Sequence, residues 1–370
     1  MRQTLYMGLL DSVHKFAKER GYHVEYDNPN DFAENEFSVD TAKKFISTLN
    51  LPFQVRDYQL EAFVHAARKR RALLLSPTAS GKSLIIYILS SLLIKKKVLI
   101  VVPTLNLVHQ MASDFVDYGC DEQHIHKIFS GQEKITNANL VVTTWQSIYK
   151  LPKTWFDQFG VVIGDEAHQF KAKSLVEIME KLANCKYRFG FTGTLDGTLT
   201  NKLVLEGLFG SVKQVTTTAE LMENKTVANL KIKALVLSYE DEARKLFAKT
   251  KPKYADEIDY ITTNQARNKF LVNLVSSLEN NTLLLFNFID HGKILEKYIR
   301  DQNPEKDVFL VYGMVEGEER EAIRKFVEEN TNVIVIASYK TFSTGVNIKN
   351  LHNVIFGSPS KSRTRVLQSI

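Results

Sequence analysis

Between residues 51 and 215, short runs of apolar residues alternate with longer stretches in which apolar side chains recur at every third or fourth position. Continuous apolar runs are typical of strands buried on both faces of a parallel sheet, and the longer period is typical of amphipathic helices. The pattern therefore predicts a parallel β-sheet with helices on both faces. The predicted strands span residues 72–75, 98–102, 140–143, 161–163 and 187–191.

The alternation stops after residue 215 and resumes at about residue 263. Between these positions the pattern is irregular, and it predicts one strand over residues 232–239 followed by a helix and a loop. The second region of alternation predicts another parallel α/β domain. Its predicted helices span residues 264–278, 293–300 and 317–328, and its predicted strands span residues 283–286, 308–312, 333–337 and 353–356.

The N-terminal segment is too short to form a domain by itself. Its pattern predicts a helix over residues 4–20, a short strand over residues 22–26 and a second helix over residues 40–48. We expect it to be a small α/β appendage of the domain that follows. The expected organisation is an appendage (1–50), a first lobe (51–215), a connecting region (216–262) and a second lobe (263–370).

The composition fits a globular protein, because 44% of the 370 residues are apolar, enough for two sizeable cores. The net charge is +6, and residues 51–370 carry a net +8 because the first 50 residues are slightly acidic. A basic body suits a polyanionic partner. The two cysteines have no disulfide or metal spacing, no apolar run approaches 18 residues, and no export signal is present. We therefore expect a cytoplasmic protein without a membrane segment.

The strongest chemical signal is the sequence Ser-Pro-Thr-Ala-Ser-Gly-Lys-Ser at residues 76–83, between a predicted strand and a helical pattern. In such a loop, backbone N–H groups point at phosphate oxygens, the lysine reaches the β- and γ-phosphates, and the following hydroxyl binds Mg²⁺. Lys82 and Ser83 are expected in those roles. Ser76 stands where the G-x-x-x-x-G-K-[ST] pattern has its first glycine, so the loop opens with a residue that disfavours positive φ.

Asp165 and Glu166 directly follow the predicted strand of residues 161–163. The carboxyl ends of parallel strands meet at one edge of the sheet, so the pair should lie near the phosphate loop. Acid pairs after strands also serve as helix N-caps. A phosphate loop, however, needs one acidic group for Mg²⁺ and another to orient the attacking water. We assign Asp165 to the metal and Glu166 to the water.

With the phosphate loop and Asp-Glu-Ala-His at residues 165–168, the chain resembles the superfamily-2 helicases and translocases. The family's other motifs follow in order. Residues 56–59 look like the R-x-Y-Q adenine element, residues 102–105 and 143–146 look like two segments that grip the nucleic-acid backbone, and residues 192–194 look like the segment that couples hydrolysis to DNA. Each motif alone is weak, but the ordered set is highly specific.

Residues 341–347 resemble segment V of that family, although a plain Ser/Thr-rich loop has the same composition, and residues 368–370 resemble the start of segment VI. Longer phrases at residues 110–118, 155–160 and 338–345 resemble the UvsW-type recombination and repair helicases of T-even-like phages. Relative to that family, we expect most of an N-terminal DNA-binding module and the rest of segment VI to be missing. The second lobe would then be incomplete, and a separate polypeptide carrying the rest of segment VI would be a partner.

The resemblance implies two RecA-like parallel-sheet lobes that bind ATP and Mg²⁺ between them. It also implies roles for individual residues. These are catalysis for Lys82, Asp165, Glu166, His168 and Gln368; nucleotide binding for Arg56, Gln59, Thr78, Ala79, Ser80, Gly81, Lys82, Ser83 and Gly345; metal binding for Ser83 and Asp165; DNA binding for Pro103, Thr104, Thr143, Thr144, Gln146 and Thr341; and coupling for Thr192 and Thr194.

The activity implied is that of an ATP-dependent helicase or translocase that remodels branched DNA. Two alternatives stay open. The first is a translocase with an RNA or restriction function, because grips on the backbone read phosphates rather than bases. The second is a fragment that binds ATP and DNA but hydrolyses ATP poorly, because the arginines of segment VI are not in the chain. Trp145 and Trp155 stay open between base stacking and core packing.

Overall fold

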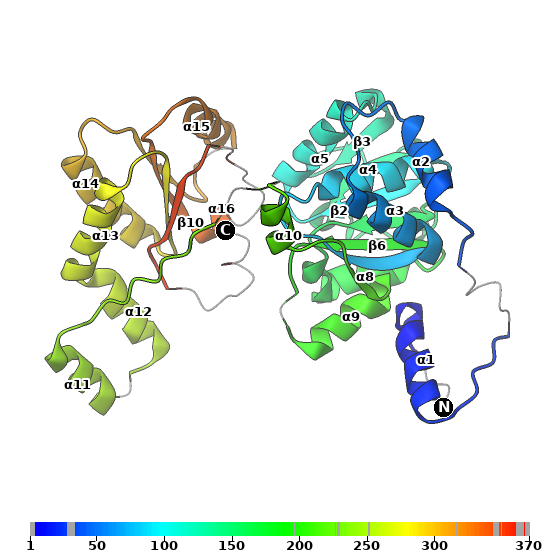
Figure 1. Ribbon diagram of the computed structural model, residues 1–370, viewed down its shortest axis with the longest axis horizontal. Coiled ribbons are helices and arrows are strands. Elements are labelled where there is room, and N and C mark those ends of the chain that lie inside the picture. The colour runs from blue at the N-terminus through cyan, green and yellow to red at the C-terminus, as the bar shows by residue number, and fades with distance from the viewer. Residues whose placement is uncertain are drawn as a thin grey trace. The chain divides into compact units, whose positions relative to one another are not determined.

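The computed structural model describes residues 4–27, 34–195, 197–225, 227, 230–250, 252–315, 317–342, 348, 350–359 and 366. The chain divides into two compact units, Met1–Asn229 and Leu230–Ile370. Each unit has its own parallel sheet and its own core (Figure 1).

The first unit is built on a seven-stranded sheet in the order β3-β4-β2-β5-β6-β1-β7. Its paired strands all run parallel, and all five predicted strands are present, which confirms the parallel α/β fold. The apolar pattern did not reveal β3 and β7, because both are edge strands with few buried side chains. The strands are β1 (Arg71–Leu75), β2 (Val98–Val102), β3 (Ile125–Ile128), β4 (Leu140–Thr144), β5 (Val161–Gly164), β6 (Tyr187–Thr192) and β7 (Val212–Gln214).

Helices cover both faces of this sheet, with α3, α4 and α5 on one side and α8 and α9 on the other (Figure 1). Successive strand residues enter opposite cores, so that Leu73 packs with α8 and α9 while Leu74 packs with α3 and α4. The helices are α3 (Asp57–Lys69), α4 (Lys82–Leu92), α5 (Leu105–Asp117), α6 (Trp145–Ile148), α7 (Lys153–Phe156), α8 (Lys173–Lys181), α9 (Leu199–Phe209) and α10 (Thr218–Glu223), with 3₁₀ turns at Ile94–Lys96, Glu122–His124 and Ala167–Lys171.

The N-terminal segment packs on the first unit at two places. The 3₁₀ turn Met7–Leu9, which leads into α1 (Leu10–Glu19), lies so close to α9 that a Cβ at Gly8 would collide with the backbone of α9. Farther along, α2 (Val39–Ser47) packs on α3, where Phe45 stacks on Phe63.

The strand predicted over residues 22–26 is wrong, since these residues are extended but belong to no sheet in the described part of the chain. Tyr22 is 63% exposed, and the Tyr26 hydroxyl bonds to His14 of α1. An alternating pattern forms a strand only where a neighbouring strand accepts its backbone hydrogen bonds.

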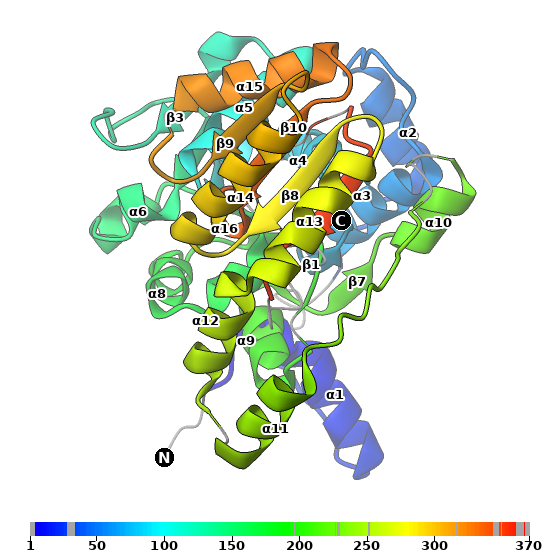
Figure 2. The ribbon, with the colours of Figure 1, turned by 90° about the vertical axis from the view of Figure 1, so that its left-hand side faces the viewer.

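The second unit has a four-stranded parallel sheet in the order β11-β8-β10-β9. Its strands and main helices (Figure 2) agree with the pattern predicted from sequence. Its apolar side chains form a core on each face of the sheet. The elements are α11 (Asp241–Thr250), α12 (Tyr254–Thr263), α13 (Gln265–Ser277), β8 (Thr282–Phe286), α14 (Ile289–Gln302), β9 (Val308–Val311), α15 (Gly317–Glu329), β10 (Ile334–Ser338), α16 (Tyr339–Phe342) and β11 (Asn353–Phe356).

The strand predicted over residues 232–239 is also wrong. The segment is extended without strand pairing in the described residues, and Ile232 and Val236 are 73% and 91% exposed. The following stretch, predicted as one helix and a loop, folds as the two helices α11 and α12.

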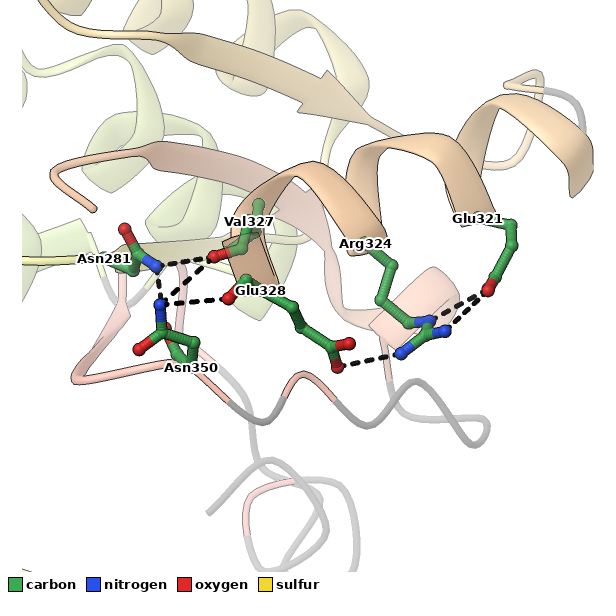
Figure 3. A network of polar contacts seen from close by, with 6 residues as sticks. All are labelled: Asn281, Glu321, Arg324, Val327, Glu328 and Asn350. Atoms are coloured by element: carbon green, nitrogen blue, oxygen red, sulfur yellow. Dashed lines mark hydrogen bonds and ion pairs between the residues drawn. The ribbon is translucent and has the colours of Figure 1, made fainter. Parts of the chain in front are cut away.

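Asn281, directly before β8, anchors the end of α15 (Figure 3). Its side-chain amide donates to the backbone oxygens of Val327, Asn330 and Asn350, while its own oxygen accepts from the Val333 N–H. The last carbonyls of a helix have no intrahelical hydrogen-bond donors, and here the side-chain amide of Asn281 donates to them. Asn281 therefore fixes α15 to the start of β10.

His291 on α14 is buried in a polar network of the second unit. Its Nε2 lies 3.0 Å from Asn268 Oδ1, which can only accept, so Nε2 carries the proton. Its Nδ1 lies 3.1 Å from Ser358 Oγ, and the Tyr339 hydroxyl donates to the Ser358 carbonyl. Burial, together with the charge of Arg267, lowers the pKa of His291 to about 4. The imidazole is therefore neutral in the folded protein at neutral pH.

This network predicts a pH dependence of stability. Below pH 6.5 the unfolded chain protonates His291 but the folded chain does not, so the stability that is complete above pH 6.5 should be lost as the pH falls towards 4. The contribution should change by at most about 1.4 kcal/mol per pH unit. Urea unfolding of the parent and of His291→Gln at pH 7, 6 and 5 measures it. Equal pH slopes for the two proteins would contradict the assignment, and His23→Gln, at an exposed site, is the control.

Candidate active site

The phosphate loop leaves β1 at Leu75 and enters α4 at Lys82. Ala79 and Gly81 have left-handed backbones with φ of 62° and 78°, and a Cβ at Gly81 would collide with the side-chain amide of Gln59. Ser76 is not among the left-handed residues. It is fully buried, and its Oγ lies 2.6 Å from Ser80 Oγ. The serine in place of the usual first glycine is thus accommodated, because the turn is made later in the loop.

The first turn of α4 is suited to bind an anion. No side chain among the described residues caps the N-terminus of α4, so the positive end of its dipole lies uncapped at the phosphate loop. Lys82 Nζ lies 3.2 Å from Oε1 of Glu166, which belongs to the loop after β5. The loop therefore combines backbone donors with a cation at one place.

Asp165 and Glu166 lie where the sequence placed them, at the carboxyl end of β5. Asp165 is 7% exposed, and its Oδ1 is buried without a hydrogen-bond partner in the part of the chain that the structure describes. Burial raises the pKa of Asp165 to about 6 although Lys82 opposes it. An orphaned, buried carboxylate oxygen beside a phosphate loop fits Mg²⁺, which binds through one or two carboxylates plus substrate phosphates.

Glu166 is held in the ionised form. Burial acts to raise its pKa, but the hydrogen bond with His168 and the charge of Lys82 outweigh burial and lower the pKa to about 2. Its backbone is left-handed with φ of 50°, a costly conformation for a residue other than glycine. The carboxylate is therefore a fixed acceptor of hydrogen bonds.

A chain of polar contacts joins this acid pair to the end of β6. His168 Nδ1 lies 3.3 Å from Glu166 Oε2 and 2.9 Å from Thr192 Oγ1. The Thr192 hydroxyl in turn donates to the carbonyl of Thr194 at 2.9 Å. The structure thus brings together the residues that the sequence assigned to hydrolysis and to coupling.

The predicted adenine element lies against the phosphate loop. The Gln59 amide accepts from the Arg56 N–H and donates to the Ser80 carbonyl, both at 3.0 Å. The Tyr58 hydroxyl donates to the same carbonyl and accepts from the Arg56 guanidinium. Gln59 therefore supports the phosphate loop through its hydrogen bond to Ser80, and the sequence motif does not reveal this contact.

The residues predicted to bind DNA differ in their availability. The hydroxyl of Thr143 donates to the Thr144 carbonyl, that of Thr144 bonds to Ser147, and Gln146 donates to the carbonyl of Pro103. The Thr104 hydroxyl is buried without a partner among the described residues, and no side chain caps α5 behind it. The Thr104 hydroxyl thus has an unused hydrogen-bonding capacity among the described residues, but the oxygen is buried.

Of the site residues predicted in the second unit, the structure describes only Thr341. It is buried, and its hydroxyl and its backbone N–H both bond to Ser338 Oγ. Gly345, Gln368 and most of segments V and VI lie outside the described residues.

Both tryptophans pack against the apolar core on the face of the sheet that α8 and α9 cover. Trp155 contacts Phe156 and Phe159 and donates to the Lys134 carbonyl, and Trp145 contacts Tyr149. These contacts favour core packing over base stacking.

The sequence missed one contact of the site. The Tyr118 hydroxyl lies 2.8 Å from the hydroxyl of Ser83, the expected metal ligand. The two residues are 35 positions apart on different helices, and no motif spacing connects them.

The two units match two families of known proteins. Residues 52–197 match the family described as Type III restriction enzyme, res subunit, and residues 266–370 match the Helicase conserved C-terminal domain. No helix in the described part of the chain combines the length and apolar character needed to span a membrane.

Individual relatives are similar to longer parts of the chain. The ATP-dependent DNA helicase uvsW of Enterobacteria phage T4 is 36% identical over 384 residues, which cover 100% of this chain and 76% of the relative. The DNA 3'-5' translocase XPB2 of Sulfurisphaera tokodaii is 29% identical over 233 residues, which cover 61% of this chain and 50% of the translocase.

Solved structures agree with these similarities. The crystal structure of T4 UvsW is 33% identical and superposes with a TM-score of 0.52. The match covers 99% of this chain and 74% of the UvsW chain. The helicase domain of Pyrococcus furiosus Hef is 15% identical with a TM-score of 0.58, which supports the fold of superfamily-2 lobes alone. The phosphate loop, the acid pair and the match to T4 UvsW over the whole chain lead to one conclusion: this chain belongs to the UvsW-like ATP-dependent helicases of superfamily 2.

Proposed function

We propose that this protein is a DNA motor that uses Mg²⁺ and ATP to remodel branched DNA in phage recombination, repair and replication. The observation that supports it most is the cluster of Lys82, Glu166 and His168 at the phosphate loop, which ties the groups for phosphate chemistry to the end of β6. The similarity to T4 UvsW, whose name describes a DNA helicase, supports DNA as the substrate class.

In the nucleotide site, Arg56 contacts the base, Gln59 keeps the phosphate loop in place through Ser80, and the N–H groups of the loop and α4 hold the phosphates. Ser83 and the orphaned oxygen of Asp165 hold Mg²⁺, which supplies charge neutralisation on the phosphates when bound. Lys82 leaves Glu166 for the phosphate oxygens as the nucleotide binds.

Glu166 then positions the attacking water. In the nucleotide-free protein its low pKa makes it a weak base, because Lys82 and His168 both stabilise its charge. Transfer of Lys82 to the phosphates removes its positive charge from Glu166, so the pKa of Glu166 rises and the carboxylate accepts the water proton more readily. ATP binding and activation of the base are thereby linked through a single lysine.

DNA binds at the start of α5, where the Thr104 hydroxyl and the uncapped N–H groups suit a phosphate oxygen. The net +8 of residues 51–370 supports an electrostatic, salt-dependent affinity. A change in nucleotide state reaches the end of β6 through the contacts from Glu166 to Thr192.

The test is the rate of ATP hydrolysis with a forked DNA, a linear duplex of the same sequence and the corresponding RNA fork. We expect the fork of DNA to stimulate most. Thr104→Val should raise the DNA concentration for half-maximal stimulation about fivefold, the value of one hydrogen bond, and leave the affinity for ATP unchanged. Thr144→Val, whose hydroxyl is already bonded within the protein, is the matched control. Equal stimulation by RNA, or by linear duplex, would overturn the assignment of substrate.

A further inference from the structure

Ser83 contacts helix α5 as well as the nucleotide site. Its Oγ lies 2.8 Å from the hydroxyl of Tyr118, the residue that ends α5. Asp114, one turn earlier on the same helix, interacts with the same serine hydroxyl, and this interaction opposes the burial that raises the pKa of Asp114. The expected metal ligand is therefore held from one side by two oxygen-bearing side chains.

The ring of Tyr118 is fixed in place. It packs edge-on against Phe53 at 5.5 Å between ring centroids, and against Tyr87 at 5.6 Å. Tyr87 lies one turn after Ser83 on α4 and also contacts Phe115. The Tyr118 hydroxyl consequently has little freedom to leave Ser83.

A serine hydroxyl has one proton and two lone pairs. It can bind a cation through a lone pair only if its proton points away from the cation, towards an acceptor. The Asp114 carboxylate can serve as that acceptor, and the Tyr118 hydroxyl, 2.8 Å from Ser83 Oγ, can either accept the proton or donate its own. Such partners behind metal ligands commonly contribute 10- to 100-fold in metal affinity.

We propose that Asp114 and Tyr118 are positioning residues that orient the Ser83 hydroxyl so that its lone pair faces the metal of a bound Mg²⁺–nucleotide complex. The proposal rests on the proposed function of Ser83 as a metal ligand. It adds α5 to the elements that build the metal site, although α5 contributes no metal ligand itself.

The experiment measures equilibrium binding of a fluorescent ATP analogue, first in EDTA and then in a Mg²⁺ titration. For Asp114→Asn and Tyr118→Phe we expect affinities in EDTA within about twofold of the parent, and a Mg²⁺ concentration for half-maximal enhancement about tenfold higher. Asp117→Asn removes the same charge from an exposed site on the same turn and should change neither quantity. In a Ser83→Ala background, Tyr118→Phe should have no further effect, because the hydroxyl that it orients is gone.

Each other outcome has a separate meaning. If Ser83→Ala raises the Mg²⁺ requirement but neither α5 variant does, the positioning role is wrong while the metal site stands. If Ser83→Ala leaves the Mg²⁺ requirement unchanged, the proposed metal site itself is wrong. Weaker binding in EDTA and in Mg²⁺ alike would mean a purely structural role and would overturn the proposal. Tyr118→Phe, which removes one oxygen atom, keeps the test possible if Asp114→Asn does not fold.

Discussion

Lys82→Ala is expected to reduce ATP hydrolysis by about 10²- to 10³-fold and to abolish measurable nucleotide binding at micromolar protein. Lys82 is the cation within 3.2 Å of Glu166 at the phosphate loop, and a preorganised charge aimed at a transferring phosphoryl group contributes about this much. The loss is large because Lys82 and Glu166 are only partly exposed, so that water replaces the missing charge poorly.

Two measurements check this prediction. Binding of a fluorescent ATP analogue and steady-state hydrolysis are compared in the parent, in Lys82→Ala and in Lys173→Ala, which removes an exposed lysine from the start of α8. Lys173→Ala should behave as the parent. Parent-like affinity of Lys82→Ala for the analogue would show that the phosphate-loop assignment is wrong.

Asp165→Asn is expected to stop Mg²⁺-dependent ATP hydrolysis. The same substitution is expected to raise the free energy of unfolding of the nucleotide-free protein. Asparagine keeps the shape of the side chain but lacks the charge that binds the metal. The native state tolerates that charge poorly, because burial raises the pKa of Asp165 from 3.8 to about 6. A residue kept at a cost in stability is typical of a functional site.

The sign of the pH dependence makes the prediction specific. The folded protein holds a proton on Asp165 more tightly than the unfolded chain, so the penalty is absent below pH 4, grows as the pH rises to about 6, and is complete above it. At pH 7 in EDTA, Asp165→Asn should be about 1 to 3 kcal/mol more stable than the parent, and the difference should vanish at pH 4. Urea unfolding measures it. A variant that is less stable than the parent at pH 7 would refute the explanation.

The two wrong strands show what a local pattern cannot supply. Residues 22–26 alternate like a true strand and residues 232–239 are largely apolar, yet neither segment belongs to a sheet in the described part of the chain. The five predicted strands of the first unit, such as β2, are largely buried and lie between two neighbours, whereas β9 and β11 of the second unit are predicted although they are partly buried edge strands. Burial on both faces of a strand requires a run of apolar residues that is visible in the sequence, whereas the presence of a pairing strand is not visible in the local sequence.

The site shows the same division. The phosphate loop and the acid pair could be predicted because both are continuous in sequence and each lies between elements with clear periodicity. The occupied hydroxyls of Thr143 and Thr144 could not be predicted, because a motif records residue type and not whether a neighbour already uses the hydroxyl.

The sequence by itself determined the parallel α/β architecture of both units, the position of the phosphate loop between β1 and α4 and that of the acid pair after β5, because periodicity and short motifs are local properties of the chain. Only the tertiary structure decided which groups are free. It paired Ser83 with Tyr118, braced Ser80 on Gln59, and left one oxygen of Asp165 without a partner among the described residues. Such contacts depend on distances between helices and strands far apart in the chain, and packing fixes those distances only after the whole sheet has formed.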